Sequence, residues 1–179
     1  MAKPILCGID EAGRGSLAGD LVIAGVILTQ TVEGLTDSKK ISEKKREELY
    51  TTIIENSLHH IISFPPKQID KEGLSRCLAI GLESIKKYLN ADIYLFDGNQ
   101  TFGVLGINTM VKADTKVAQV SAASILAKVT HDRAIIKASK IYKEYGFEKH
   151  KGYGTKRHIE AIKKYGYCNI HRLSFKIKP

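Results

Sequence analysis

The segment 21–28 constrains the fold of this chain more than any other stretch. It reads Leu-Val-Ile-Ala-Gly-Val-Ile-Leu and has no polar side chain. A short apolar run of this kind is typical of a strand that is buried on both faces of a sheet. Such a strand needs a covering layer on each side. The segment 71–89, whose leucines and isoleucines recur at helical spacing, could supply one of these layers.

The rest of the chain alternates between strand-like and helix-like segments, which predicts an α/β fold. We expect further strands at residues 4–10, 60–64, 93–96 and 104–111. We expect helices from a cap cluster at 36–38 to residue 56, and at 71–89, 114–145 and 155–164.

Length and composition suggest one folded domain over residues 1–179. The chain has 43% hydrophobic residues, enough to form a core. No apolar stretch approaches the length of a membrane span, and the first residues lack the apolar core of a secretory signal. The cysteines Cys7, Cys77 and Cys168 form no close pair, so we expect free thiols. These features favour a cytoplasmic protein, and we expect a monomer.

Charge is concentrated at the end of the chain. Lys and Arg number 28 against 19 acids, for a net charge of +9. Residues 149–179 contain nine of these basic residues and one acid. A basic C-terminal region on a nearly neutral body favours binding to a polyanion such as nucleic acid, although a solubilising tail is the alternative.

Four acids lie where strands end or a helix begins. Asp10 and Glu11 close the first predicted strand, Asp97 closes the strand that begins at residue 93, and Asp114 begins a long helix. Ligand sites in open α/β sheets gather at the carboxyl ends of strands, so Asp10 and Asp97 would meet if their strands are parallel neighbours. Each acid has another explanation as a turn or cap residue. Asp10 and Glu11, as neighbours on a strand, would also face opposite ways.

A cluster of carboxylates at a partly buried site is costly unless a cation neutralises it. Mg²⁺ and Mn²⁺ prefer oxygen ligands and keep several waters, which suits a site that must also admit a phosphate. Two such ions can flank a phosphodiester during its hydrolysis. The four acids therefore predict a site for divalent cations.

Several motifs, in order along nearly the whole chain, resemble the signatures of the ribonuclease HII family. They are Gly-Ile-Asp-Glu-Ala-Gly-Arg-Gly at 8–15, Thr-Asp-Ser-Lys-Lys at 36–40, Asp-Gly at 97–98, Lys-Ala-Asp at 112–114 with the segment 120–129, His-Lys-Gly-Tyr-Gly-Thr at 150–155, and His-Arg-Leu-Ser-Phe at 171–175.

This resemblance implies a ribonuclease H-like fold, with a central five-stranded mixed sheet flanked by helices. It implies that Asp10, Glu11, Asp97 and Asp114 bind two divalent ions, Mn²⁺ or Mg²⁺, in the substrate complex. It also implies endonucleolytic cleavage of RNA in RNA–DNA hybrids, and cleavage 5′ to single ribonucleotides embedded in duplex DNA. The products would carry 3′-hydroxyl and 5′-phosphate ends.

The resemblance also implies how the substrate is read. The loop Gly13, Arg14 and Gly15 would read the ribose 2′-hydroxyl, the group that distinguishes RNA from DNA locally. Tyr153 would stack on the next, deoxy sugar and exclude an added hydroxyl. The family usually has proline where this chain has Ser16 and Asp20, which predicts a less rigid loop.

Some alternatives remain open at this point. Lys39 and Lys40 either bind phosphate or form a solvated pair at the start of a helix. Lys128 and His131 receive no role. The activity could be that of another nuclease with the same fold, either a hybrid-only ribonuclease or a DNA resolvase. A catalytically inactive nucleic-acid-binding module is the third possibility, although all four acids are present.

Overall fold

A five-stranded sheet with the order β3-β2-β1-β4-β5 forms the centre of the computed structural model, which describes residues 3–35 and 41–177. Its strands are β1 Leu6–Ala12, β2 Leu21–Leu28, β3 Ser57–Phe64, β4 Ile93–Asp97 and β5 Ile107–Met110. The first three strands pair antiparallel, whereas β4 runs parallel to β1 and to β5. The predicted mixed sheet and ribonuclease H-like fold class are confirmed.

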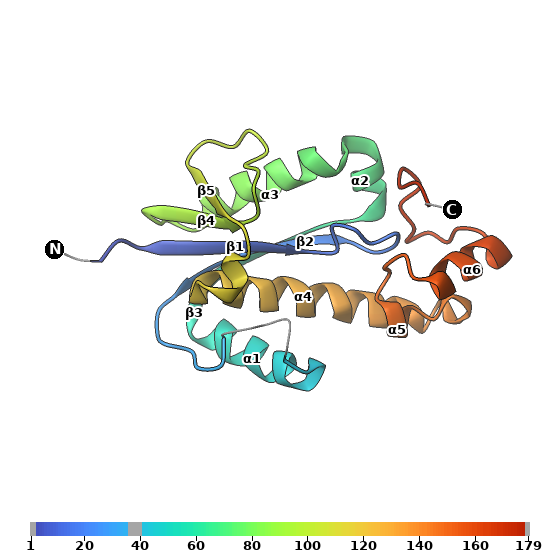
Figure 1. The fold of residues 1–179 in the computed structure, drawn as a ribbon, viewed down its shortest axis with the longest axis horizontal. Helices are drawn as coiled ribbons and strands as arrows, with labels where there is room; N and C mark the ends of the chain where they lie inside the picture. Colours follow the sequence, from blue (N-terminus) through green and yellow to red (C-terminus); the bar gives the residue numbers. More distant parts are fainter. Residues whose placement is uncertain (1–2, 36–40, 178–179) are drawn as a thin grey trace.

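Helices cover both faces of the sheet (Figure 1). Helices α2 Pro66–Glu72 and α3 Leu74–Tyr88 lie on one face, and α1 Glu43–Glu55 and α4 Ala118–Ser139 lie on the other. Each face has its own apolar core. The apolar strand β2 contributes to both cores, with Leu21 and Ile23 on one side and Val22 and Ala24 on the other. This is the two-sided burial that its sequence predicts.

Several predicted boundaries are wrong. The helix expected at 71–89 is divided by Gly73, whose φ of 83° is left-handed and interrupts a regular helix. The helix expected at 114–145 is shorter: Asp114 lies in the 3-10 turn η1 Ala113–Thr115, and Val117 is the N-cap of α4. Helix α1 is capped by Ser42, whose hydroxyl accepts from Lys45 N, while the expected cap cluster 36–38 lies outside the described residues.

Helix α4 approaches β1 closely because both elements present small residues. A Cβ built on Gly8 would lie 2.2 Å from the backbone carbon of Gln119. Ala122 and Ala123, on the same helix, are fully buried. This contact places α4 and the turn that precedes it directly against the strand that carries Asp10.

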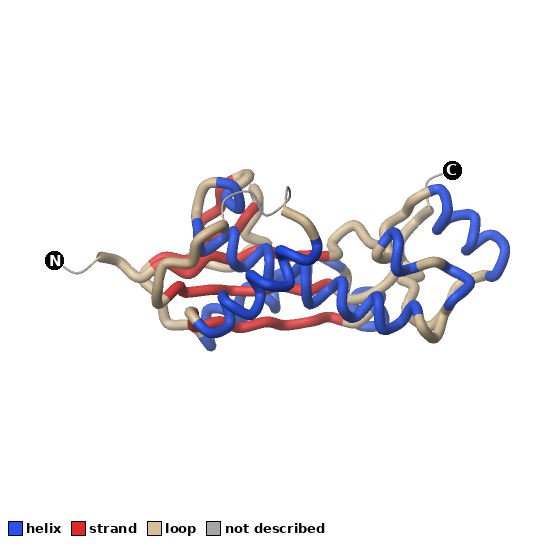
Figure 2. The backbone as a smooth tube through the Cα atoms, turned by 90° about the horizontal axis from the view of Figure 1, so that it is seen from below, coloured by secondary structure: helices blue, strands red, loops and turns tan. Residues whose placement is uncertain are grey.

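The C-terminal elements pack beyond the end of the sheet (Figure 2). They are the 3-10 turn η2 Lys143–Tyr145, α5 Phe147–His150 and α6 Lys156–Tyr165. They form a separate apolar cluster around Tyr145 and Phe147. Within the described ranges, no helix is both long enough and apolar enough to span a membrane. The three cysteines are free, as expected.

Candidate active site

Three of the four predicted acids meet at one edge of the sheet. Asp10 lies on β1 and Asp97 ends β4, and these strands are parallel neighbours with Ile9 opposite Phe96. Asp114 comes from the turn η1 after β5. One carboxylate oxygen of each residue lies within 4.8 Å of the others, a spacing that could hold a metal ion. The expected meeting of Asp10 and Asp97 therefore occurs.

The electrostatics of this group favour a bound cation. Burial raises the pKa of Asp10 well above its usual value, and the nearby charges of Glu11 and Asp97 raise it further. A hydrogen bond from Ser124 and another from Glu11 N, at 2.8 Å, act in the opposite direction. Asp97 is held by the amide of Ala113, which donates to Oδ1 at 3.1 Å. Carboxylates crowded in this way are stabilised when a divalent ion shares their charge.

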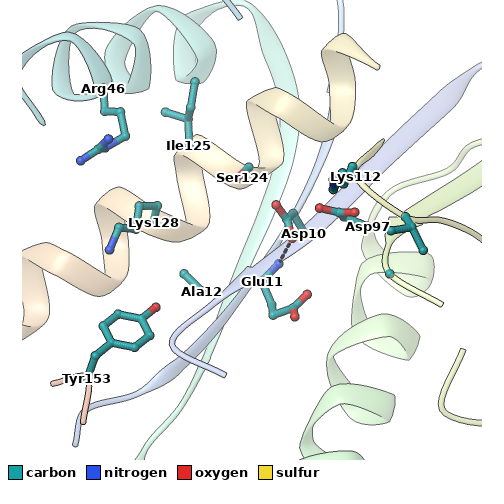
Figure 3. Close-up of a pocket in the computed structure, with 12 residues that line it drawn as sticks. Asp10, Glu11, Ala12, Arg46, Asp97, Lys112, Ser124, Ile125, Lys128 and Tyr153 are labelled. Carbon is teal, nitrogen blue, oxygen red and sulfur yellow. Dashed lines mark hydrogen bonds between the residues drawn. The ribbon is translucent and has the colours of Figure 1, made fainter. Parts of the chain in front are cut away.

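Glu11 stands apart from these three acids. Its carboxylate points away from the Asp10–Asp97 pair, as expected for consecutive strand residues (Figure 3). Its Oε1 lies 3.5 Å from Arg14 Nη1. Burial raises the pKa of Glu11, while the charge of Arg14 lowers it. Its Oε2 is buried and has no hydrogen-bond partner among the described residues. A buried carboxylate oxygen without a partner suits the binding of a cation that arrives with the substrate.

Asp10, Glu11 and Asp97 line a pocket of about 550 Å³, a volume in the range of small-ligand sites. Three basic side chains line it, from different elements: Arg46 from α1, Lys112 beside η1, and Lys128 from α4 (Figure 3). Ser124 also lines it. The sequence reasoning assigned no role to these four residues. Arg46 in particular looks like any other charged residue of a solvated helix, so only the fold reveals where it points.

The glycine-rich loop begins where β1 ends. Gly13 has a φ of 81°, and a Cβ at this position would lie 2.5 Å from Asp20 O, so only glycine fits without strain. Arg14 and Gly15 are exposed, and a Cβ on Gly15 would meet nothing within 4 Å. Gly13 is therefore required by the loop itself. Gly15 leaves free space on its outer side.

The C-terminal region fastens this loop. Leu17 N donates to Gly152 O at 2.8 Å, and Arg172 N donates to Leu17 O at 2.9 Å. The fully buried guanidinium of Arg172 donates to Gly19 O at 2.9 Å and to Arg14 O at 3.3 Å. These bonds hold the loop although its two expected prolines are absent. Whether the loop is less rigid stays a prediction.

Tyr153 lines the same pocket and is half-buried. Its backbone bridges to Ser16, which places it beside the glycine loop. His158 Nδ1 lies 2.9 Å from Tyr153 O, and His158 Nε2 lies 3.0 Å from His171 Nε2. Tyr153 thus lines one pocket together with Asp10, Glu11 and Asp97, and the glycine loop lies beside Tyr153. Lys39 lies outside the described residues.

Comparisons with known proteins agree with this geometry. A family model described as ribonuclease HII matches residues 7–178. Ribonuclease HII of Sulfurovum sp. strain NBC37-1 is 64% identical over 176 residues, covering 98% of this chain and 93% of that protein.

Two solved structures have the same fold. Ribonuclease HII of Archaeoglobus fulgidus, in its complex with PCNA, has a TM-score of 0.85 and 27% identity, with coverage of 98% of this chain and 96% of that one. Ribonuclease H2 of Pyrococcus horikoshii has a TM-score of 0.80 and 28% identity, with coverage of 96% and 94%. The chain belongs to the ribonuclease HII family.

Proposed function

We propose that this protein is an endoribonuclease that hydrolyses RNA in RNA–DNA hybrids and cuts 5′ to single ribonucleotides embedded in duplex DNA. In this reaction water adds to phosphorus and the bond to the 3′ oxygen breaks. The products carry a 3′-hydroxyl and a 5′-phosphate. The observation that carries the proposal is the group of Asp10, Asp97 and Asp114 beside a basic pocket, in a chain of this family.

The donor set fits Mg²⁺ or Mn²⁺, because it consists of carboxylate oxygens. Asp10, Asp97 and Asp114 would hold the cation, and Glu11 would complete the set for two ions when substrate is bound. Bound cations would neutralise the carboxylates, lower the pKa of the attacking water and stabilise the leaving oxygen. The chain's own contribution is to keep these acids close together at a buried strand edge.

Basic residues of the pocket and the neighbouring glycine loop would bind and select the substrate. Arg46, Lys112 and Lys128 present positive charge to the phosphate backbone. The loop Gly13, Arg14 and Gly15 would read the 2′-hydroxyl, with the open side of Gly15 allowing close approach. Lys39 is proposed as a further phosphate contact.

The basic region 149–179 would extend this surface along the duplex, within a single catalytic domain over residues 1–179. We propose that the protein acts as a cytoplasmic monomer.

A cleavage assay tests the function. Three labelled duplexes are compared: DNA with one ribonucleotide, an RNA–DNA hybrid, and DNA alone. With Mg²⁺ or Mn²⁺ we expect the first two to be cut, the first at the 5′ side of the ribonucleotide, and the third to stay intact. EDTA should stop both reactions. Cleavage of the hybrid alone would support a hybrid-only ribonuclease, and cleavage of DNA alone would support a resolvase.

Tyr153→Ala tests the proposed sugar contact. Removing the ring should reduce kcat/KM at the single ribonucleotide by about 10-fold, roughly 1.4 kcal/mol, because the deoxy sugar loses the surface on which it packs. Tyr88→Ala, which removes an exposed tyrosine at the end of α3, is the matched control and should leave the rate near that of the wild type. Equal rates for the wild type and Tyr153→Ala would remove Tyr153 from the site.

A further inference from the structure

His131, on helix α4, lies between the glycine loop and Tyr153. Its side chain is fully buried. A Cβ on Gly13 would come within 2.6 Å of its Cδ2 and 2.8 Å of its Nε2, so the turn at Gly13 packs directly on the imidazole. On another side, the ring centroids of His131 and Tyr153 are 5.9 Å apart. The imidazole therefore contacts both the glycine loop and Tyr153.

Hydrogen bonds orient this ring. Its Nδ1 lies 3.0 Å from Asp132 Oδ1, and the same oxygen accepts from Lys128 Nζ at 2.9 Å. Burial alone would raise the pKa of Asp132, but these bonds from His131 and Lys128 outweigh it and lower the pKa. A carboxylate only accepts, so Nδ1 carries the proton that is donated to Asp132.

The opposite nitrogen of the ring faces the loop. Nε2 lies 3.5 Å from Ser16 Oγ, at the outer limit of a hydrogen bond, and can accept from that hydroxyl. Ser16 is itself fully buried and forms the backbone bridge to Tyr153. Lys128 joins the same assembly, because its ammonium lies 5.4 Å from the centroid of the Tyr153 ring. The side chain of His131 thus contacts the loop, Tyr153 and Asp132, the carboxylate that also binds Lys128.

We propose that His131 is a positioning residue that sets the spacing between the loop 13–16 and Tyr153. This inference rests on the proposed function, in which the loop reads a ribose and Tyr153 contacts the following deoxy sugar. If the two contacts must engage adjacent nucleotides together, their spacing determines how well a ribonucleotide followed by DNA is distinguished. Displacement of a substrate contact by about 1 Å can cost on the order of 100-fold in rate.

His131→Leu tests the proposal, because leucine fills much of the same space but forms neither polar contact. We expect kcat/KM at the single ribonucleotide to fall about tenfold relative to kcat/KM on the hybrid. In the RNA strand of the hybrid, the ribonucleotide that the loop reads is not followed by a deoxy sugar. Cleavage of the hybrid therefore depends less on this spacing. His131→Gln, whose amide can donate to Asp132 and accept from Ser16, should restore most of the ratio.

His60→Leu is the matched control. It removes another histidine–serine contact, between His60 Nε2 and Ser84 Oγ at 2.9 Å, on the far strand β3. The substrate ratio should not change in this variant. Amide chemical shifts of Gly13, Ser16 and Tyr153 provide a readout that is independent of activity, and they should move in His131→Leu and return toward wild type in His131→Gln.

The possible results separate the two proposals. If the wild type leaves the single-ribonucleotide duplex intact, the proposed function fails. If the wild type cuts this duplex, and His131→Leu lowers kcat/KM equally on both substrates or on neither, the positioning role is overturned. Should His131→Leu fail to fold, His131→Asn replaces it, because the shorter amide cannot reach both partners. An Asn variant with the same substrate ratio as His131→Gln would also overturn the role.

Discussion

Asp10→Asn is expected to abolish cleavage while substrate binding persists. The amide keeps the shape of the side chain but removes one anionic oxygen from the group formed with Asp97 and Asp114. Loss of a metal ligand should cost several kcal/mol in the transition state, or on the order of 1,000-fold in rate. Binding should change little, because the proposed phosphate contacts come from the basic residues around the pocket.

The same substitution should stabilise the metal-free protein. Burial raises the pKa of Asp10 in the folded state, so as pH rises above 3.8 the folded protein retains protons that the unfolded chain has released. The contribution of Asp10 to the free energy of unfolding therefore declines as pH rises above the ordinary value of 3.8. Asparagine does not titrate, so its advantage over aspartate should grow from pH 4 toward neutral pH.

Urea unfolding in EDTA at pH 5 and pH 7.5, together with cleavage and filter-binding assays, measures these effects. Glu33→Gln, which neutralises an exposed acid elsewhere, is the control and should match wild type in all three. Full cleavage by Asp10→Asn would contradict the metal site. A metal-free variant less stable than wild type at pH 7.5 would contradict the electrostatic account of Asp10.

Gly8→Ala should produce the largest loss of stability. The new Cβ would lie 2.2–2.6 Å from three backbone atoms of Gln119 and Val120, and helix backbone cannot rotate aside as a side chain can. Helix α4 would have to move away from β1, at a cost of about 3 kcal/mol or more. Since α4 carries Ser124 against Asp10, the folded fraction should also lose activity.

Gly25→Ala is the matched comparison. Gly25 lies opposite Ile9 on the neighbouring strand, and its Cβ would meet side-chain atoms of Ile85 and Leu89. These atoms can shift, so the expected loss is smaller, about 1 kcal/mol. Chemical denaturation of both variants measures the difference. Equal losses would show that α4 and β1 are not in the tight contact described above.

The strands of the sheet could be predicted from the sequence, because hydrophobic patterning is a local property of the chain. The segment 21–28 predicted a doubly buried strand, and β2 has these bounds and contributes to both cores. Element ends were less predictable. Gly73 divides a segment with continuous helical spacing, and Asp114 sits in a turn rather than at a cap. In both cases the backbone geometry depends on packing that spacing does not encode.

By itself, the sequence determined the fold class and the chemistry-bearing acids, through strand-end placement and family motifs. Only the tertiary structure decided how those residues are grouped. It joins Asp10, Asp97 and Asp114, and it turns Glu11 toward Arg14 because alternate strand residues face opposite ways. It also brings Arg46 and Lys128 to the pocket, and seats His131 between the loop and Tyr153. These contacts join residues far apart in the chain, so their geometry comes from helix-on-sheet packing.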